Sequence, residues 1–147
     1  MKSMSGRCLC GAVRFVAEGV ESGFDACHCG MCRRWSGGPF FTAKTSHVVF
    51  EGTEALARYE SSTWAERGFC RTCGSTLFYY LKPTRAFMMS VGAFDDSSPF
   101  RLVEEIFIDH KPNGYALAGD HPRLTQAETF AKVAPADQGS SSTRESV

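Results

Sequence analysis

Residues 8–15 read CLCGAVRF: two cysteines separated by one residue, a glycine, and then a segment of alternating apolar and polar side chains. The alternation over residues 12–17 places Val13 and Phe15 on one face, which predicts a half-buried strand. A second cysteine pair, CRTCG at residues 70–74, lies far along the chain. Two such pairs can supply the four thiolates of a tetrahedral zinc site, which would tie the N-terminal strand to the middle of the chain.

We therefore expect Cys8, Cys10, Cys70 and Cys73 to hold a structural zinc ion, with the first pair at the start of a strand and the second pair in a turn between strands. Ordinary buried thiols are the alternative. Cys10, Cys29 and Cys73 are each followed by glycine. Glycine tolerates the positive φ that curls the backbone around a metal and directs amide N–H groups at the sulfur.

The segment CHCGMC at residues 27–32 contributes three further cysteines. Three protein ligands and one open position are typical of a catalytic zinc site. Cys29 and Cys32 are three residues apart, so one helical turn places them on the same side, and Cys27 in an extended segment can direct its sulfur to the same point. Three thiolates favour a fourth soft ligand, so we expect an incoming thiol, which the metal would deprotonate.

Other interpretations of this segment remain open at this stage. His28 is a possible fourth ligand that would close the site, although neighbours in an extended segment point to opposite sides. A cysteine-ligated iron or iron–sulfur site is a further alternative, but the recognisable cluster spacings do not match. A redox dithiol of Cys29 and Cys32 is weakened by the third cysteine and by the lack of a βαβ context.

Composition limits the function classes. The chain has 147 residues, 43% of them hydrophobic and 22% charged, which is ordinary for one globular domain. Sixteen basic residues balance sixteen acidic ones, so we expect no nucleic-acid partner. No secretory signal is visible and the apolar runs are too short to span a membrane, so we expect a cytoplasmic protein with reduced cysteines. The oligomeric state lies beyond the sequence.

The pattern of short segments predicts a β-dominated fold. We expect one domain over residues 1–133, followed by a disordered tail at 134–147 with almost no apolar content. One helical turn is predicted at Gly30–Ser36. Segments rich in Phe, Tyr, Val and Thr between Gly-, Pro- and Ser-containing turns predict the further strands: Phe40–Ala43, Val48–Glu51, Leu56–Glu60, Glu66–Phe69, Thr76–Leu81, Phe87–Val91 and Glu104–Ile108.

Five motifs carry a family resemblance. CLCGAVRF, CHCGMCRRWSGGPF, YESSTWAERGFCRTCGSTLFY, MSVGAFDD and EIFIDHKP occur in the order seen in the glutathione-dependent formaldehyde-activating enzyme family, also called the centromere protein V family. The chain resembles this family from Arg7 to Leu124. The resemblance implies coiled antiparallel sheets of the β-tent type and two zinc ions per chain. It implies a structural ion held by Cys8, Cys10, Cys70 and Cys73, and a catalytic ion held by Cys27, Cys29 and Cys32.

The resemblance also implies an activity, the condensation of formaldehyde with glutathione to S-(hydroxymethyl)glutathione. In the reverse direction this reaction is that of a carbon–sulfur lyase. Glutathione carries two carboxylates, so Arg33 and Arg34, directly after the cysteine trio, are candidate substrate-binding residues. The chain departs from the family pattern where relatives commonly carry a tryptophan, because Gly114 and then Tyr115 follow the KPN segment. This departure bears on ligand identity if that position lines the substrate cleft.

Two hypotheses from other classes compete with the enzyme. The first is a non-catalytic zinc module that binds glutathione or a thiol adduct as a carrier, and the sequence does not separate it from a catalyst. The second is a chromatin-associated module, which the neutral charge and the missing basic tail disfavour.

Overall fold

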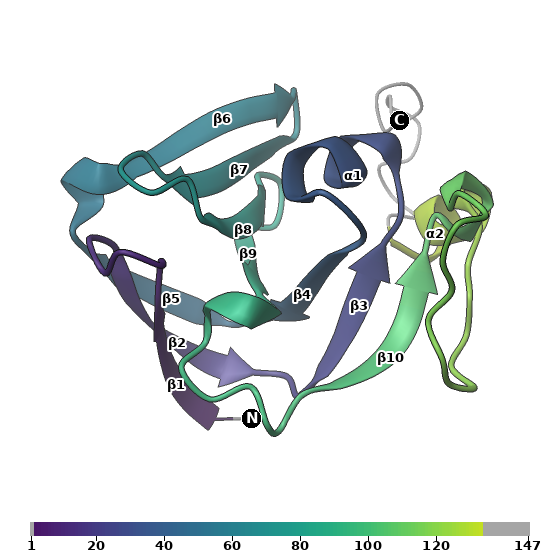
Figure 1. Ribbon diagram of the computed structural model, residues 1–147, viewed down its shortest axis with the longest axis horizontal. Coiled ribbons are helices and arrows are strands. Elements are labelled where there is room, and N and C mark those ends of the chain that lie inside the picture. Colours follow the sequence, from purple (N-terminus) through teal and green to yellow (C-terminus); the bar gives the residue numbers. More distant parts are fainter. Residues whose placement is uncertain (1, 134–147) are drawn as a thin grey trace. The chain divides into compact units, whose positions relative to one another are not determined.

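The computed structural model describes residues 2–133, and strands dominate this part of the chain (Figure 1). The predicted β-dominated class is thus confirmed, whereas the predicted tail at 134–147 lies outside the described residues. The helices are α1 (Gly30–Ser36) and α2 (Gln126–Val133). The strands are β1 (Lys2–Arg7), β2 (Arg14–Val20), β3 (Gly23–Cys27), β4 (Phe40–Lys44), β5 (His47–Glu51), β6 (Leu56–Ser62), β7 (Ala65–Cys70), β8 (Thr76–Leu81), β9 (Ala86–Ser90) and β10 (Arg101–Ile106).

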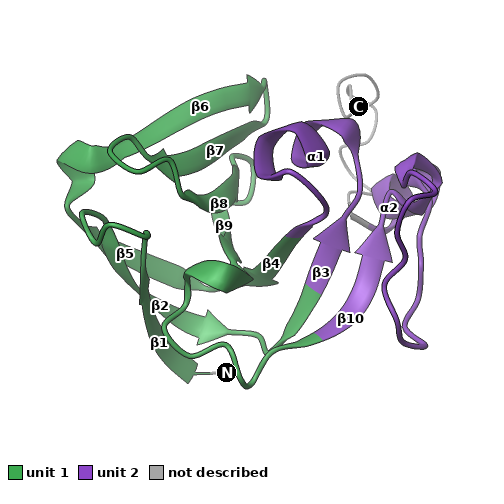
Figure 2. Cartoon of the chain, in the orientation of Figure 1, with its two compact units in different colours: residues 1–24, 41–101 green, residues 25–40, 102–147 purple. Residues whose placement is uncertain are grey.

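The chain divides into two compact units (Figure 2). Unit 1 comprises residues 1–24 and 41–101, and unit 2 comprises residues 25–40 and 102–147. Unit 2 is therefore built from two segments that are distant in the sequence. The single domain expected over residues 1–133 stays a prediction.

Unit 1 contains two groups of antiparallel strands. β1, β2 and β5 form a three-stranded sheet in the order β1-β2-β5, and the other strands of this unit lie in the order β4-β9-β8-β7-β6. Alternate residues of β2 are buried, because successive side chains of a strand point to opposite faces. Val13 and Phe15 are both buried, so the face predicted from the alternation is confirmed.

Aromatic rings fill the core of unit 1. Phe78 on β8 meets Phe87 on β9 edge to face with ring centroids 4.9 Å apart, and Phe15 meets Phe94 in the same manner at 5.3 Å. The Phe78 ring lies directly over Gly68 of β7, where an added Cβ would come within 2.2 Å of it. The absence of a side chain at Gly68 therefore leaves the space over β7 that the Phe78 ring occupies.

Unit 2 places residues 25–27 of β3 beside residues 102–106 of β10. Directly after β3, the chain turns into α1, whose predicted position at Gly30–Ser36 is confirmed. Helix α1 ends at Gly37, which has a φ of 86° and donates its N–H to the carbonyl of Arg33. Helix α2 was not predicted.

The ends of several elements differ from the sequence-based expectation. The first predicted strand, 12–17, is shifted to β2, and the last, 104–108, ends earlier as β10. Cys8 and Cys10 do not begin a strand, which corrects the expectation above. They lie in the turn between β1 and β2, where the N–H of Cys8 donates to the carbonyl of Val13 at 3.0 Å. None of the helices within residues 2–133 has the length and apolar character needed to cross a membrane.

Candidate metal centres

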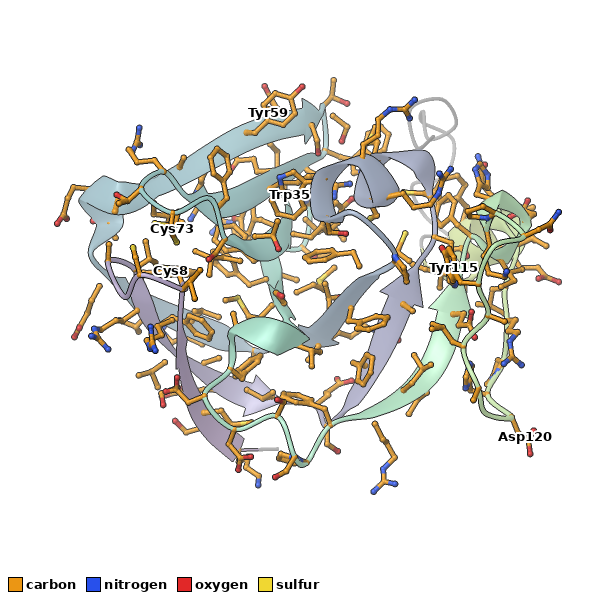
Figure 3. All side chains as sticks on the ribbon, in the orientation of Figure 1. Cys8, Trp35, Tyr59, Cys73, Tyr115 and Asp120 are labelled. Atoms are coloured by element: carbon orange, nitrogen blue, oxygen red, sulfur yellow. The ribbon has the colours of Figure 1, made fainter. Side chains whose placement is uncertain are left out.

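The first cysteine group lies entirely within unit 1. The sulfur atoms of Cys8, Cys10, Cys70 and Cys73 all lie within 4.8 Å of one another (Figure 3 labels Cys8 and Cys73). The Cys8–Cys10 sulfur distance is 3.7 Å and the Cys10–Cys70 distance is 3.9 Å. Sulfurs around a tetrahedral zinc ion with Zn–S bonds near 2.3 Å would be about 3.8 Å apart, so these spacings suit a shared metal ion rather than a disulfide.

Backbone N–H groups point at these sulfurs. The N–H of Val13 lies 3.3 Å from the Cys8 sulfur, and the N–H groups of Thr72 and Cys73 lie 3.3 and 3.4 Å from the Cys70 sulfur. The turn that creates the last two contacts depends on Gly74, which has a φ of +80°. Such donors stabilise thiolates and are typical of metal-bound cysteines, so the residues fit a metal ion.

Two thiols of this group, Cys73 and Cys10, have pKa values shifted in opposite directions. Hydrogen bonds from the Ser75 hydroxyl and backbone lower the pKa of Cys73 to about 5. The Ala12 N–H acts to lower the pKa of Cys10, but burial and hydrogen bonds with the neighbouring sulfurs outweigh it and raise that pKa to about 11. The group therefore keeps protons that a metal ion would displace.

The second cysteine group lies entirely within unit 2. The sulfurs of Cys27, Cys29 and Cys32 also lie within 4.8 Å of one another, and we call this group the sulfur triad. Cys27 ends β3, Cys29 is the N-cap of α1, and Cys32 lies in its first turn with its N–H 3.4 Å from the Cys29 sulfur. The expectation that the glycine after Cys29 adopts a positive φ is wrong. This residue, Gly30, is the first residue of α1 and has a helical backbone conformation.

The sulfur triad is largely shielded from water, with Cys29 and Cys32 only 5% and 4% exposed. Hydrogen bonds with the sulfurs of Cys29 and Cys32, together with burial, raise the pKa of Cys27 well above its ordinary value. Three clustered sulfurs on a helix N-terminus suit zinc or another thiophilic metal. Binding of such an ion would require the release of the retained protons.

His28 does not join the sulfur triad. Its side chain is fully buried and points away, with Nε2 2.7 Å from Oε1 of Glu105 and Nδ1 2.9 Å from the hydroxyl of Tyr115. The alternation of side chains in an extended segment explains this orientation, as expected from the sequence. Within residues 2–133, only cysteines group around this position as candidate metal ligands.

Glu105 is the centre of a hydrogen-bonded network that the sequence did not reveal. Its carboxylate is 1% exposed and, besides the bond from His28, accepts bonds from Nε2 of His121 at 2.6 Å and Nε of Arg123 at 3.0 Å. Burial acts to raise the pKa of Glu105, but the bonds from His121 and His28 outweigh it and hold the pKa below its ordinary value. The carboxylate is thus ionised inside the protein.

The two candidate arginines have different surroundings. Arg33 is half-buried, and its Nε donates to the carbonyl of His28 at 3.0 Å. Arg34 is exposed on the same helix. Tyr115, which Figure 3 labels, follows Gly114 at the departure from the family pattern. It is half-buried, and its ring centroid lies 5.6 Å from that of His28. The structure therefore brings Arg33 and Tyr115 to the segment that carries the sulfur triad.

Comparisons with known proteins agree with this geometry. The profile of the family described as glutathione-dependent formaldehyde-activating enzyme matches residues 3–110. An uncharacterized lyase of Schizosaccharomyces pombe is 31% identical over 136 residues, which cover 90% of this chain and 98% of the relative. A crystal structure of a Rhodobacter sphaeroides protein is 26% identical with a TM-score of 0.54, covering 82% of this chain and 99% of that chain.

Proposed function

The chain belongs to the glutathione-dependent formaldehyde-activating enzyme family, and from this premise we propose that it is a zinc-dependent carbon–sulfur lyase-type enzyme. In this proposal it joins glutathione to formaldehyde, or to a related small aldehyde, as S-(hydroxymethyl)glutathione. The observation that carries the proposal is the division of seven cysteines into a group of four and a sulfur triad. Four sulfurs fill a tetrahedral site, whereas three leave one corner for a substrate.

Cys8, Cys10, Cys70 and Cys73 would hold a structural zinc ion, and Cys27, Cys29 and Cys32 would hold a catalytic one. When bound, the catalytic zinc would lower the pKa of an incoming thiol and present its sulfur for attack on the aldehyde carbon. The sulfurs of the triad are largely buried. This burial would limit the access of water to the open coordination position that the thiol is to occupy. Within residues 2–133, which include all seven cysteines, no disulfide is formed, and this suits the reducing cytoplasm that we propose as the location.

Arg33 is our candidate for binding a glutathione carboxylate. Its Nε is fixed by the carbonyl of His28, so its two terminal nitrogens remain to form a bidentate pair with a carboxylate. The same bond ties the guanidinium to the segment between Cys27 and Cys29. Arg34 has the same charge on the same helix but is exposed, so it serves as a matched control.

The arginine pair gives a direct prediction. A hydrogen bond to a charged group contributes about 1.5–3 kcal/mol, so Arg33→Gln should raise the KM for glutathione roughly 10- to 100-fold with a smaller effect on kcat. Arg34→Gln should change the KM less than about twofold, because exposed charges contribute little. Steady-state kinetics with varied glutathione measure both. Equal effects of the two substitutions on the KM for glutathione would show that Arg33 does not bind the substrate.

Turnover tests the proposed activity itself. Exchange NMR should show that the zinc-loaded protein forms and breaks the glutathione–formaldehyde adduct faster than the spontaneous reaction does. Cys29→Ser should return the rate to the spontaneous value, since the sulfur triad loses a ligand. If the protein binds glutathione but the rate stays spontaneous, the enzyme is refuted and the carrier alternative remains.

A further inference from the structure

His28 is held at every polar atom that it has. Its backbone N–H donates to the carbonyl of Ile106 at 3.2 Å, and its carbonyl accepts from Arg33 at 3.0 Å. Its ring nitrogens meet Glu105 and Tyr115 at 2.7 and 2.9 Å. This residue lies between two members of the sulfur triad, so whatever fixes it also fixes the peptide segment that carries two of the three sulfurs.

The partner that determines the ring orientation is Glu105. An ionised carboxylate only accepts hydrogen bonds, so Nε2 of His28 must carry the proton that joins them. The other ring nitrogen, Nδ1, lies within hydrogen-bonding distance of the Tyr115 hydroxyl. Contacts at both nitrogens thereby hold the ring in one orientation.

Glu105 is itself held firmly. Its backbone N–H donates to the carbonyl of Pro122 at 3.0 Å, and its carbonyl accepts from the N–H of Leu124 at 2.8 Å. Its second carboxylate oxygen accepts from His121 and Arg123. Burying a carboxylate is unfavourable unless its oxygens accept hydrogen bonds. These hydrogen bonds hold Glu105 in one position, and Glu105 in turn holds His28.

We propose that Glu105 is a positioning residue for the sulfur triad: it acts through His28 to hold the Cys27–Cys29 segment in the orientation that a metal ion requires. This inference rests on the proposed metal site at the sulfur triad. Glu105 does not touch the metal or the substrate. It orients a segment that does, as hydrogen-bonding partners behind metal ligands commonly do.

The test compares two neighbouring carboxylates. Glu105→Gln keeps the size of the side chain but removes the charge that holds the His28 ring. Glu104→Gln is the matched control, because Glu104 pairs with Lys132 and not with His28. The four-cysteine group of the same chain serves as an internal reference. Metal affinity at both sites is measured on the full chain by zinc competition with a chelator of known affinity.

We expect Glu105→Gln to weaken zinc binding at the sulfur triad about 10-fold and to leave the four-cysteine group unchanged. This is the lower end of the range for partners that bond a metal ligand directly, because Glu105 bonds His28 between two ligands. With Co²⁺ in place of zinc, the ligand-field bands of the triad site should shift in Glu105→Gln alone. A general loss of stability would not produce this selective spectral change. Equal triad affinity and equal spectra in the two variants would overturn the proposal.

Glu105→Asp is the second variant if Glu105→Gln does not fold. It keeps the negative charge but is one methylene shorter, so it should still weaken zinc binding at the sulfur triad relative to Glu104→Asp. Equal triad affinity in these two variants would overturn the proposal. Uptake of one zinc ion per wild-type chain instead of two would refute the proposed function, whereas two ions in the wild type and unchanged triad affinity in the Glu105 variants would refute only the role of Glu105.

Discussion

Cys27 and Cys73 have opposite acidities, and metal ions must compete with their protons. Neighbouring sulfurs and burial raise the pKa of Cys27 well above its ordinary value, whereas bonds from Ser75 lower the pKa of Cys73 to about 5. A thiol must lose its proton to bind a metal, so a raised pKa weakens binding at any pH below it. Cys73 remains a thiolate down to a pH near 5.

Cys10 of the four-cysteine group also has a raised pKa, about 11, so metal binding displaces a proton at both groups. The sulfur triad would hold its ion by three sulfurs and the other group by four. Because fewer ligands hold the triad ion, we predict that acidification releases it at a higher pH than the ion of the four-cysteine group. Zinc release during stepwise acidification can be followed with a zinc-sensitive dye. Cys29→Ser should lack the release step that occurs at the higher pH, which assigns that step to the triad. Release from the four-cysteine group first would contradict the prediction.

Cysteine spacing predicted which sulfurs lie together, and side-chain alternation predicted that His28 points away from the sulfur triad. The partners of His28 could not be predicted in the same way. Glu105 and Tyr115 are 77 and 87 residues away along the chain, and neither belongs to a spacing pattern that implies contact. Arg33 and Arg34 were equally good candidates for binding a carboxylate on the basis of the sequence. Only the position of each residue on α1 distinguishes them, because Arg33 is half-buried and Arg34 is exposed.

At the level of elements, the connection between β5 and β6 depends on one glycine. Gly52 has a φ of +76°, and a Cβ at this position would lie 1.9 Å from the carbonyl oxygen of Ala12. A left-handed conformation alone costs a non-glycine residue about 1–3 kcal/mol, and the backbone must also move. Gly52→Ala should therefore lower the free energy of unfolding by more than about 1 kcal/mol.

Gly92→Ala is the control for this prediction. An added Cβ at Gly92 would meet no atom within 4 Å, and its φ is not positive. Chemical denaturation of the zinc-loaded proteins measures both changes. If the two alanine variants are equally stable, then the turn does not need the glycine at position 52.

Most strands could be predicted because they are rich in Phe, Tyr, Val and Thr and lie between Gly-, Pro- and Ser-containing turns. β1 and β3 could not be predicted, because KSMSGR is mainly polar and GFDAC contains only one aromatic or β-branched residue, so backbone pairing rather than side-chain pattern determines these strands. Helix α2 did carry a signal that was missed. Thr125 and Glu128 form a reciprocal capping box, with bonds of 2.8 and 3.1 Å, and the sequence TQAE is its signature.

For the whole molecule, the two cysteine groups should differ in what they stabilise. Cys8 and Cys70 are 2% and 0% exposed and belong to the hydrophobic core of unit 1. A structural zinc site contributes apparent binding energy of about 10–16 kcal/mol, comparable to or larger than the roughly 5–15 kcal/mol stability of a typical domain. Loss of this ion should therefore unfold the protein.

We predict two zinc ions per chain by native mass spectrometry. Cys29→Ser should retain one ion and the wild-type circular dichroism spectrum, whereas Cys73→Ser should lose the folded state. Equal damage from both substitutions would refute this division between a structural and a catalytic ion.

The β-dominated class and the family were accessible from the sequence, because ordered motifs cover most of the chain. The division into two units was not. Unit 2 joins residues 25–40 to residues 102–147, and no composition change marks the points where the chain passes from one unit to the other.

The separation of 77 residues between His28 and Glu105 also has a consequence for synthesis. At a ribosomal speed of about 5–20 residues per second, Glu105 is added roughly 4 to 15 s after His28. During this interval the nascent chain carries Cys27, Cys29 and Cys32 without the scaffold that later surrounds them. Newly made protein thus depends on reductants to keep these sulfurs from oxidation at least until Glu105 has been added.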